Sequence, residues 1–172
     1  SEFKDAYDSA RSHILSGNSV EGGGILPCPE QFLDYRDKYS NKKNPNIKIW
    51  GIDTYGSVFK KYHETGIFDK NEIYPYSTEG IGEDILPKNV DFSLIDHFEK
   101  VTDKSAAIYT RKLAKEEGIF AGNSCGAAIK GVLQLKEKLK KEDVVVVLIH
   151  DSGSRYIGKI YNDDWMKSKN FI

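Results

Sequence analysis

The segment EEGIFAGNSCGAA, residues 116–128, decides the fold because it predicts a helix end, a short apolar stretch, a tight turn and a new helix. The first helix is expected over 103–117, with Asp103 as its cap and Gly118 as its stop. The second is expected over about 124–140, with one buried stripe of apolar side chains at helical spacing. The residues of this stripe are Ala128, Val132, Leu135 and Leu139.

Outward from this segment, two β-rich runs indicate a parallel sheet. Residues 47–52 form a short strand-like run that ends at Asp53, and a helix is expected after the turn at 55–57. Residues 144–149 are a continuous apolar run of strand length, which predicts a strand covered on both faces. Strands that alternate with helices favour an α/β fold with a parallel sheet. The stretch 70–92 is rich in Gly, Pro and Tyr and predicts a long functional loop.

Composition narrows the class of protein. The 172 residues suit one globular domain, and 39% apolar with 30% charged residues argues against disorder. A net charge of −1 provides no basic surface for nucleic acid, and no apolar run is long enough to span a membrane. The two cysteines, Cys28 and Cys125, form no disulfide framework, and the four histidines lie too far apart in sequence for a local metal motif. We therefore expect a cytoplasmic protein without a metal site.

Three clusters could carry chemistry, and each also has a purely structural interpretation. At 122–126, Ser124 lies near a helix N-terminus, where ligands dock in α/β proteins, although such a serine can simply cap the helix. At 79–84, two glycines two residues apart let a backbone approach a ligand, but they also suit a surface turn. Residues 150–156 follow the predicted strand, on the edge where such sheets bind ligands, or they form a loop that satisfies its own backbone.

In this order and spacing the clusters resemble the β-family of pyridoxal-phosphate (PLP) enzymes, and in particular the cystathionine β-synthase/cysteine synthase family. The matching motifs are EGIGED at 79–84 with Pro87, the segment at 116–128, DSGSRY at 151–156 and NDDWM at 162–166. The upstream run NPNIKIWGIDTYGS at 44–57 fits the same template. The resemblance covers residues 44–172 and implies the closing part of a fold-type II catalytic domain. Such a domain has a three-layer, Rossmann-like parallel sheet flanked by helices.

The resemblance also implies a site and a reaction. A serine at the position of Ser124 forms a hydrogen bond with the PLP pyridine nitrogen, and a neutral hydroxyl does not fix a proton there as a carboxylate would. The ring is then a mild electron sink, which suits β-replacement on L-serine or a cysteine-like donor by a thiol. The implied partners are small amino-acid and thiol substrates. The implied cofactor-binding residues are Ser124, Gly80, Ile81, Gly82, Asn123 and Asp151.

Residues 1–43 depart from the family as a divergent or compressed segment, and no catalytic residue is assigned. One register takes Lys4 as an echo of the Schiff-base lysine and the glycines at 22–24 as an echo of the phosphate loop. A rival register, which we prefer, takes 7–13 as a later family segment and leaves no lysine. The alternative function is therefore a non-catalytic α/β module, a truncated, engineered or split form without the lysine half. Because a truncated sheet leaves apolar surface uncovered, we expect a homo-oligomer or a companion chain.

Overall fold

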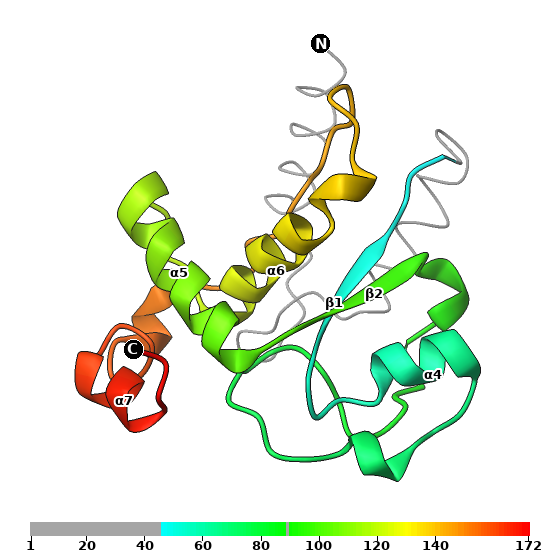
Figure 1. The fold of residues 1–172 in the computed structure, drawn as a ribbon, viewed down its shortest axis with the longest axis horizontal. Coiled ribbons are helices and arrows are strands. Elements are labelled where there is room, and N and C mark those ends of the chain that lie inside the picture. The colour runs from blue at the N-terminus through cyan, green and yellow to red at the C-terminus, as the bar shows by residue number, and fades with distance from the viewer. Residues whose placement is uncertain (1–45, 89) are drawn as a thin grey trace, which may run out of the picture.

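The fold is built around a pair of parallel strands with helices packed against it (Figure 1). The computed structural model describes residues 46–88 and 90–172. Strand β1 (Trp50–Thr54) pairs in parallel with β2 (His97–Val101), and helix α4 (Phe59–Thr65) lies between them in the chain. The further helices are α5 (Asp103–Glu117), α6 (Asn123–Gln134) and α7 (Asp163–Ser168). The expected α/β class with parallel pairing is confirmed, and the sheet has two strands within the described residues.

The two strands differ in how clearly the sequence predicts them. The run predicted at 47–52 forms β1, which begins at Trp50 and continues through Asp53 to Thr54. Strand β2 was not predicted, because its sequence HFEKV mixes charged with apolar residues. In β2 only Phe98 and Val101 are buried, so its signal is confined to two side chains. Pairing with β1 therefore depends on distant contacts rather than on a strong local pattern.

Helix α5 has the predicted bounds, but its cap lies one residue earlier than expected. Thr102 is the N-cap, and its Oγ1 accepts a hydrogen bond from the backbone N–H of Ser105 at 3.2 Å. The prediction that Asp103 caps the helix was wrong, because Asp103 is the first helical residue. Its carboxylate accepts from the backbone N–H groups at 77 and 78, at 2.6 and 2.9 Å. Asp103 thereby fixes the long loop to α5, and Gly118 ends the helix in a left-handed conformation as predicted.

Helix α6 packs closely on α5 through small residues. It runs over Asn123–Gln134 and so ends before the predicted residue 140. A Cβ on Gly126 would lie 2.1 Å from Thr110 Oγ1 and 2.4 Å from the carbonyl oxygen of Ala106, so only glycine fits at this crossing. The predicted stripe was partly wrong: Leu135 is buried, whereas three of its members are only half-buried. Those three are Ala128, Val132 and Leu139. The buried residues of α6 are instead mostly small ones, which approach α5 at Gly126 and strand β1 at Gly131.

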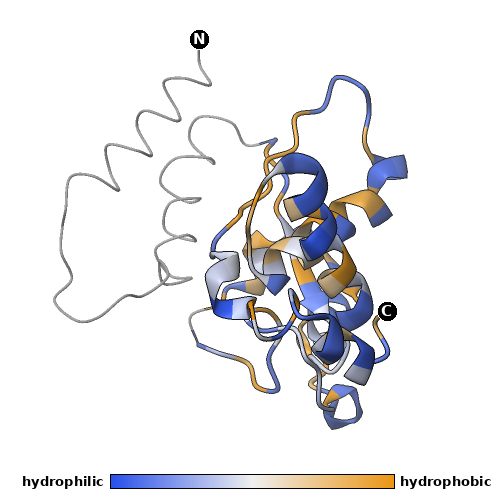
Figure 2. Ribbon diagram, turned by 90° about the vertical axis from the view of Figure 1, so that its left-hand side faces the viewer, coloured by the Kyte–Doolittle hydropathy of each residue, from blue (hydrophilic) through white to orange (hydrophobic). Residues whose placement is uncertain are grey.

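The prediction of a buried strand at 144–149 was wrong. The run is extended chain without a strand assignment, and Val144 and Val146 are 81% and 80% exposed (Figure 1). In Figure 2 the apolar residues, drawn in orange, lie in chain outside the helices as well as within them. A strand buried on both faces needs neighbouring strands and covering layers, and the described sheet consists of β1 and β2 alone. The apolar pattern is therefore present without the tertiary contacts that would bury it.

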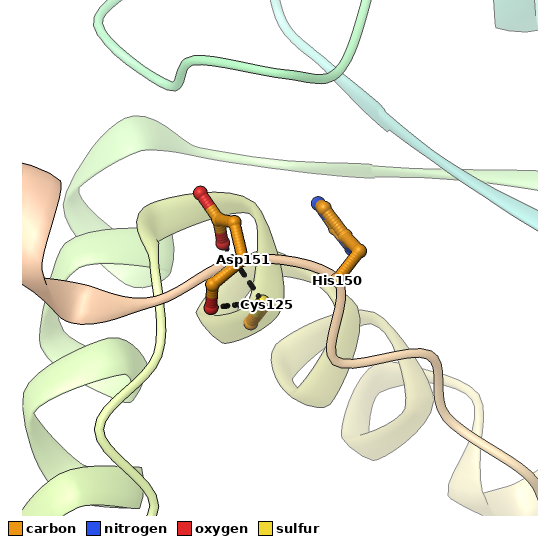
Figure 3. Close-up of side chains that lie close together, drawn as sticks. All are labelled: Cys125, His150 and Asp151. Carbon is orange, nitrogen blue, oxygen red and sulfur yellow. Dashed lines mark hydrogen bonds between the residues drawn. The ribbon is translucent and has the colours of Figure 1, made fainter. Parts of the chain in front are cut away.

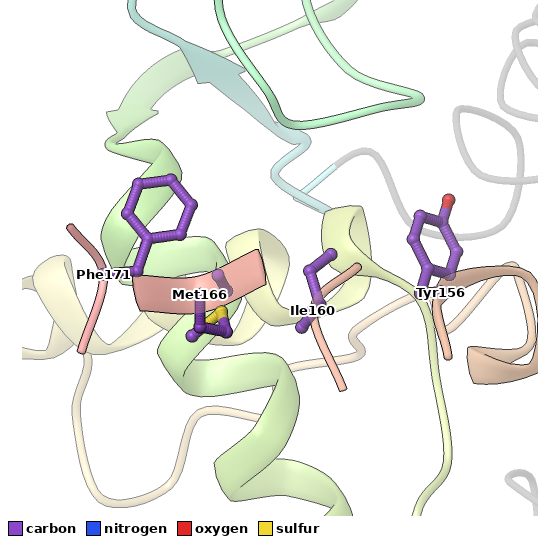
Figure 4. Close-up of a cluster of buried hydrophobic side chains, with 5 residues drawn as sticks. Tyr156, Ile160, Met166 and Phe171 are labelled. Atoms are coloured by element: carbon purple, nitrogen blue, oxygen red, sulfur yellow. The ribbon is translucent and has the colours of Figure 1, made fainter. Parts of the chain in front are cut away.

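The C-terminal segment forms a small core against α5 (Figure 4). Asn162 caps α7 by accepting a hydrogen bond from the backbone N–H of Trp165 at 3.0 Å. The buried members of this core come from α5 and from the last seventeen residues of the chain. They are Ala107, Tyr156, Ile160, Met166 and Phe171. Among the described residues, no helix combines the length and the apolar character that a membrane crossing requires.

Candidate cofactor-binding site

The candidate site forms where the turn before α6 meets the segment that follows the 144–149 run. The backbone N–H of Gly122 donates to the carbonyl of Asp151 at 3.2 Å, and that of Gly153 donates to the carbonyl of Phe120 at 3.1 Å. These bonds make an antiparallel bridge between Ala121 and Ser152. Two segments about thirty residues apart in sequence are thus held together at the N-terminus of α6.

The carboxylate of Asp151 fixes this junction (Figure 3). Its Oδ2 accepts a hydrogen bond from the Tyr156 hydroxyl at 2.7 Å, and its Oδ1 accepts one from the Cys125 thiol at 3.2 Å. Burial raises the pKa of both donors, so each keeps its proton near neutral pH. A Cβ on Gly122 would lie 2.1 Å from Oδ1, so the carboxylate also packs directly on the turn. Both oxygens of Asp151 therefore have partners within the protein.

Ser124, the central predicted residue, lies in the first turn of α6 and is 1% exposed. Its Oγ lies 2.6 Å from Nε2 of His150, the residue just before Asp151. Either group can donate in this bond, depending on the tautomer of the imidazole. Figure 3 shows His150 and Asp151 on the chain segment that passes over the first turn of α6, where Cys125 lies.

Asn123, next to Ser124, carries an unsatisfied side chain. It is fully buried, and within the described part of the chain neither Oδ1 nor Nδ2 has a hydrogen-bond partner. A buried polar group left unpaired costs about 1 to 3 kcal/mol. A ligand with complementary polar atoms at the N-terminus of α6 would remove this cost.

The glycine loop predicted at 79–84 approaches the same site. A Cβ on Gly80 would lie 3.4 Å from Ser124 Oγ, so the bare Cα of Gly80 faces the serine hydroxyl. Gly80 and Gly82 both have positive φ angles, 86° and 76°. A Cβ on Gly82 would lie 2.7 Å from Thr54 Cγ2. Ile81 packs on a buried apolar cluster formed by residues of β2, α5 and α6. That cluster contains Val101, Ala106 and Ala127. Ile81 and Gly82 thus anchor the loop, and Gly80 faces the site.

The structure therefore brings four of the six predicted residues together at the N-terminus of α6: Gly80, Asn123, Ser124 and Asp151. Ile81 and Gly82 instead pack against the core and hold the loop in place. Their assignment to cofactor binding stays a prediction. The prediction left out three side chains that complete the hydrogen-bond network, namely Cys125, His150 and Tyr156. Their sequence signal was their position within the motifs at 122–126 and 150–156.

Cys125, His150 and Asp151 also form a compact group of potential metal ligands. One ligand atom from each lies within 4.8 Å of the others. These groups already form hydrogen bonds within the protein. His150 bonds to Ser124. Asp151 accepts from Cys125 and from Tyr156. A metal ion would have to displace these bonds and deprotonate a thiol whose pKa burial raises. We therefore treat the group as a hydrogen-bond network.

Comparison with known proteins defines the class. Residues 37–151 match the model of a family described as pyridoxal-phosphate dependent enzyme. The chain belongs to this family of PLP-dependent enzymes, whose cofactor is pyridoxal phosphate.

Within that family the similar curated proteins are cystathionine β-synthases, which confirms the resemblance drawn from the motifs. The protein from Dictyostelium discoideum is 37% identical over 128 residues, which cover 74% of this chain and 25% of that protein. The protein from Saccharomyces cerevisiae is 35% identical over 136 residues, which cover 77% and 26% of the two chains. The chain thus spans about a quarter of the length of these relatives.

Solved structures confirm the fold class. The O-acetylserine dependent cystathionine β-synthase from Helicobacter pylori aligns with a TM-score of 0.59 and 33% identity, over 73% of this chain and 38% of that one. O-ureido-L-serine synthase aligns with a TM-score of 0.62 over 76% of this chain and 41% of that one. At 23% identity the second similarity concerns the fold alone.

The described residues fit one end of PLP. The Ser124 hydroxyl suits a ring nitrogen, the unpaired amide of Asn123 offers further polar atoms, and the bare backbone of Gly80 leaves room beside them. Both registers of residues 1–43 lie outside the described residues: the one that takes Lys4 and the glycines at 22–24 as echoes of the lysine and phosphate segments, and the preferred one that leaves no lysine.

Proposed function

We propose that this chain contributes the ring-binding half of a PLP-dependent β-replacement site, which joins L-serine or a cysteine-like donor to a thiol acceptor. The observation that carries the proposal is the buried Ser124 hydroxyl opposite Gly80, beside the unpaired Asn123 amide. The names of the relatives support the reaction class, since they are cystathionine β-synthases.

In this proposal each described residue has a defined task. Ser124 binds the ring nitrogen, Gly80 leaves its face open to the ring, and Asp151 holds the N-terminus of α6 in place through Tyr156 and Cys125. When bound, PLP supplies an electron sink for the carbanion formed at the substrate Cα. A neutral hydroxyl at the ring nitrogen keeps this sink mild, which favours elimination and addition at Cβ.

A second candidate function is a non-catalytic α/β module. It is favoured by the exposed apolar run at 144–149, which the described residues leave uncovered. In this alternative the chain binds PLP weakly or not at all, and it performs no chemistry without a second polypeptide. The two candidates differ in whether PLP becomes covalently attached to the isolated chain.

The test is titration of the purified chain with PLP and, in parallel, with pyridoxine 5′-phosphate, which has no aldehyde. If the chain carries its own Schiff-base lysine, PLP gives a visible band that borohydride removes, and mass spectrometry locates the modified lysine; the non-catalytic module gives no such band. We expect Ser124→Ala to weaken binding of the aldehyde-free analogue roughly three- to tenfold, because one neutral hydrogen bond is lost. Ser154→Ala, at an exposed serine on the neighbouring segment, is the matched control.

The outcomes separate the candidates. A band with PLP, followed by a thioether product from L-serine and a thiol, supports the β-replacement function. Binding of the aldehyde-free analogue without a borohydride-sensitive band supports the non-catalytic module. If neither ligand binds, the proposed ring-binding role of Ser124 is wrong, and the non-catalytic module is supported.

A further inference from the structure

His150 forms a hydrogen bond with the Ser124 hydroxyl. Its Nε2 lies 2.6 Å from Ser124 Oγ. The backbone next to His150 is held firmly, because the carbonyl of Asp151 accepts from the N–H of Gly122 and its carboxylate accepts from Tyr156. The imidazole is therefore held against the hydroxyl that the proposed function assigns to the cofactor ring.

The direction of this hydrogen bond decides what Ser124 can offer to a ligand. A serine hydroxyl has one hydrogen to donate and two lone pairs that accept. If His150 accepts that hydrogen, the oxygen can only accept from a ligand and would favour a protonated ring nitrogen. If His150 donates from Nε2, the hydroxyl hydrogen stays available for an unprotonated ring nitrogen.

We infer that His150 is a positioning residue that donates from Nε2 to Ser124 Oγ and thereby directs the Ser124 hydrogen to the ring nitrogen of the cofactor. This inference rests on the proposed function. Its consequence is that the ring nitrogen stays unprotonated, so the cofactor remains a mild electron sink. His150 acts through Ser124 and need not touch the cofactor.

The first test uses the chain without cofactor. In ¹⁵N-histidine-labelled protein, NMR distinguishes a protonated from an unprotonated Nε2. We expect His150 to carry its proton on Nε2, and we expect Ser124→Ala to shift the Nε2 resonance because its acceptor is removed. An unprotonated Nε2, or a resonance that Ser124→Ala leaves unchanged, overturns the inference.

The second test uses pyridoxine 5′-phosphate labelled with ¹⁵N in the ring, whose chemical shift reports protonation of that nitrogen. In the unaltered chain we expect the shift of an unprotonated, hydrogen-bonded nitrogen. His150→Leu removes the group that orients the Ser124 hydroxyl, so the hydrogen bond to the ring nitrogen should weaken and the nitrogen shift should change. His150→Gln restores an N–H donor and should largely restore the shift. His97→Leu, at a histidine paired with Glu99 on β2, should leave it unchanged.

Failure of the inference is distinguishable from failure of the proposed function. If the labelled ligand binds no variant, the proposed function is wrong and the role of His150 falls with it. If the ligand binds and its nitrogen shift is the same in the unaltered chain, His150→Leu and His150→Gln, only the inference about His150 is wrong. Should His150→Leu fail to fold by circular dichroism, His150→Gln and the tautomer measurement still decide.

Discussion

At the scale of single residues, the Asp151 carboxylate connects the site to the core. Tyr156 donates to its Oδ2 at 2.7 Å while being part of the C-terminal core on α5. Tyr156→Phe keeps the ring but leaves one carboxylate oxygen without its donor. We expect a loss of about 1 to 3 kcal/mol in the free energy of unfolding, measured by urea denaturation. Tyr74→Phe, at an exposed tyrosine, is the control, and equal stability of both variants would contradict this role of Asp151.

Cys125 gives a prediction for pH. Burial raises the pKa of its thiol above that of an unfolded cysteine. Between the two pKa values the unfolded state releases a proton that the folded state keeps, so stability falls as pH rises. The contribution is complete below about pH 8.5, the pKa of the free side chain. We expect the free energy of unfolding to drop more between pH 7 and pH 9.5 in the unaltered chain than in Cys125→Ser. Parallel pH profiles would contradict the burial of this thiol.

At the scale of elements, local signals predicted α5 and strand β1, but neither the end of α6 nor strand β2. Helix α5 has the expected bounds because its stop at Gly118 is encoded within one turn of chain. The prediction of a buried strand at 144–149 was wrong because apolar composition alone does not supply the neighbouring strands that would bury it. Strand β2 was missed for the opposite reason, since two consecutive charged residues, Glu99 and Lys100, separate its two buried ones. A helix end with its own stop residue, such as Gly118, is a local property, whereas strand burial depends on distant partners.

The α5–α6 crossing allows a test in which packing and helix propensity oppose each other. Alanine is favoured over glycine inside a helix by about 1 kcal/mol, so propensity alone predicts that Gly126→Ala stabilises α6. A Cβ there would lie 2.1 Å from Thr110 Oγ1 and 2.4 Å from the Thr110 backbone nitrogen. We expect this overpacking to dominate and to lower the melting temperature by several degrees. Gly158→Ala adds a Cβ with no heavy atom within 4 Å and should change it little.

At the scale of the whole molecule, the sequence motifs predicted which residues form the site, but they did not predict the hydrogen bonds between those residues. Ser124 and Gly80 were both expected, and a Cβ on Gly80 would lie 3.4 Å from the Ser124 hydroxyl. The bond between Ser124 and His150 joins residues 26 positions apart, and no local pattern encodes it. It depends on the antiparallel bridge that brings the two segments together. Motifs that lie far apart in sequence thus predict which residues gather, whereas the pairing within the group requires the structure.

The exposed run at 144–149 leads to the last prediction, for assembly. Val146 is 80% exposed in extended chain, and extended apolar chain can pair with another strand. We propose that another polypeptide, a second copy or a companion chain, covers this run. Light scattering after size-exclusion chromatography should show self-association that rises with concentration and weakens in Val146→Lys. Ile157→Lys, at an exposed apolar residue outside the run, should behave like the unaltered chain. A monomer at every concentration would rule out a second copy as the cover, because self-association would otherwise remove the apolar run from water, and would leave a companion chain.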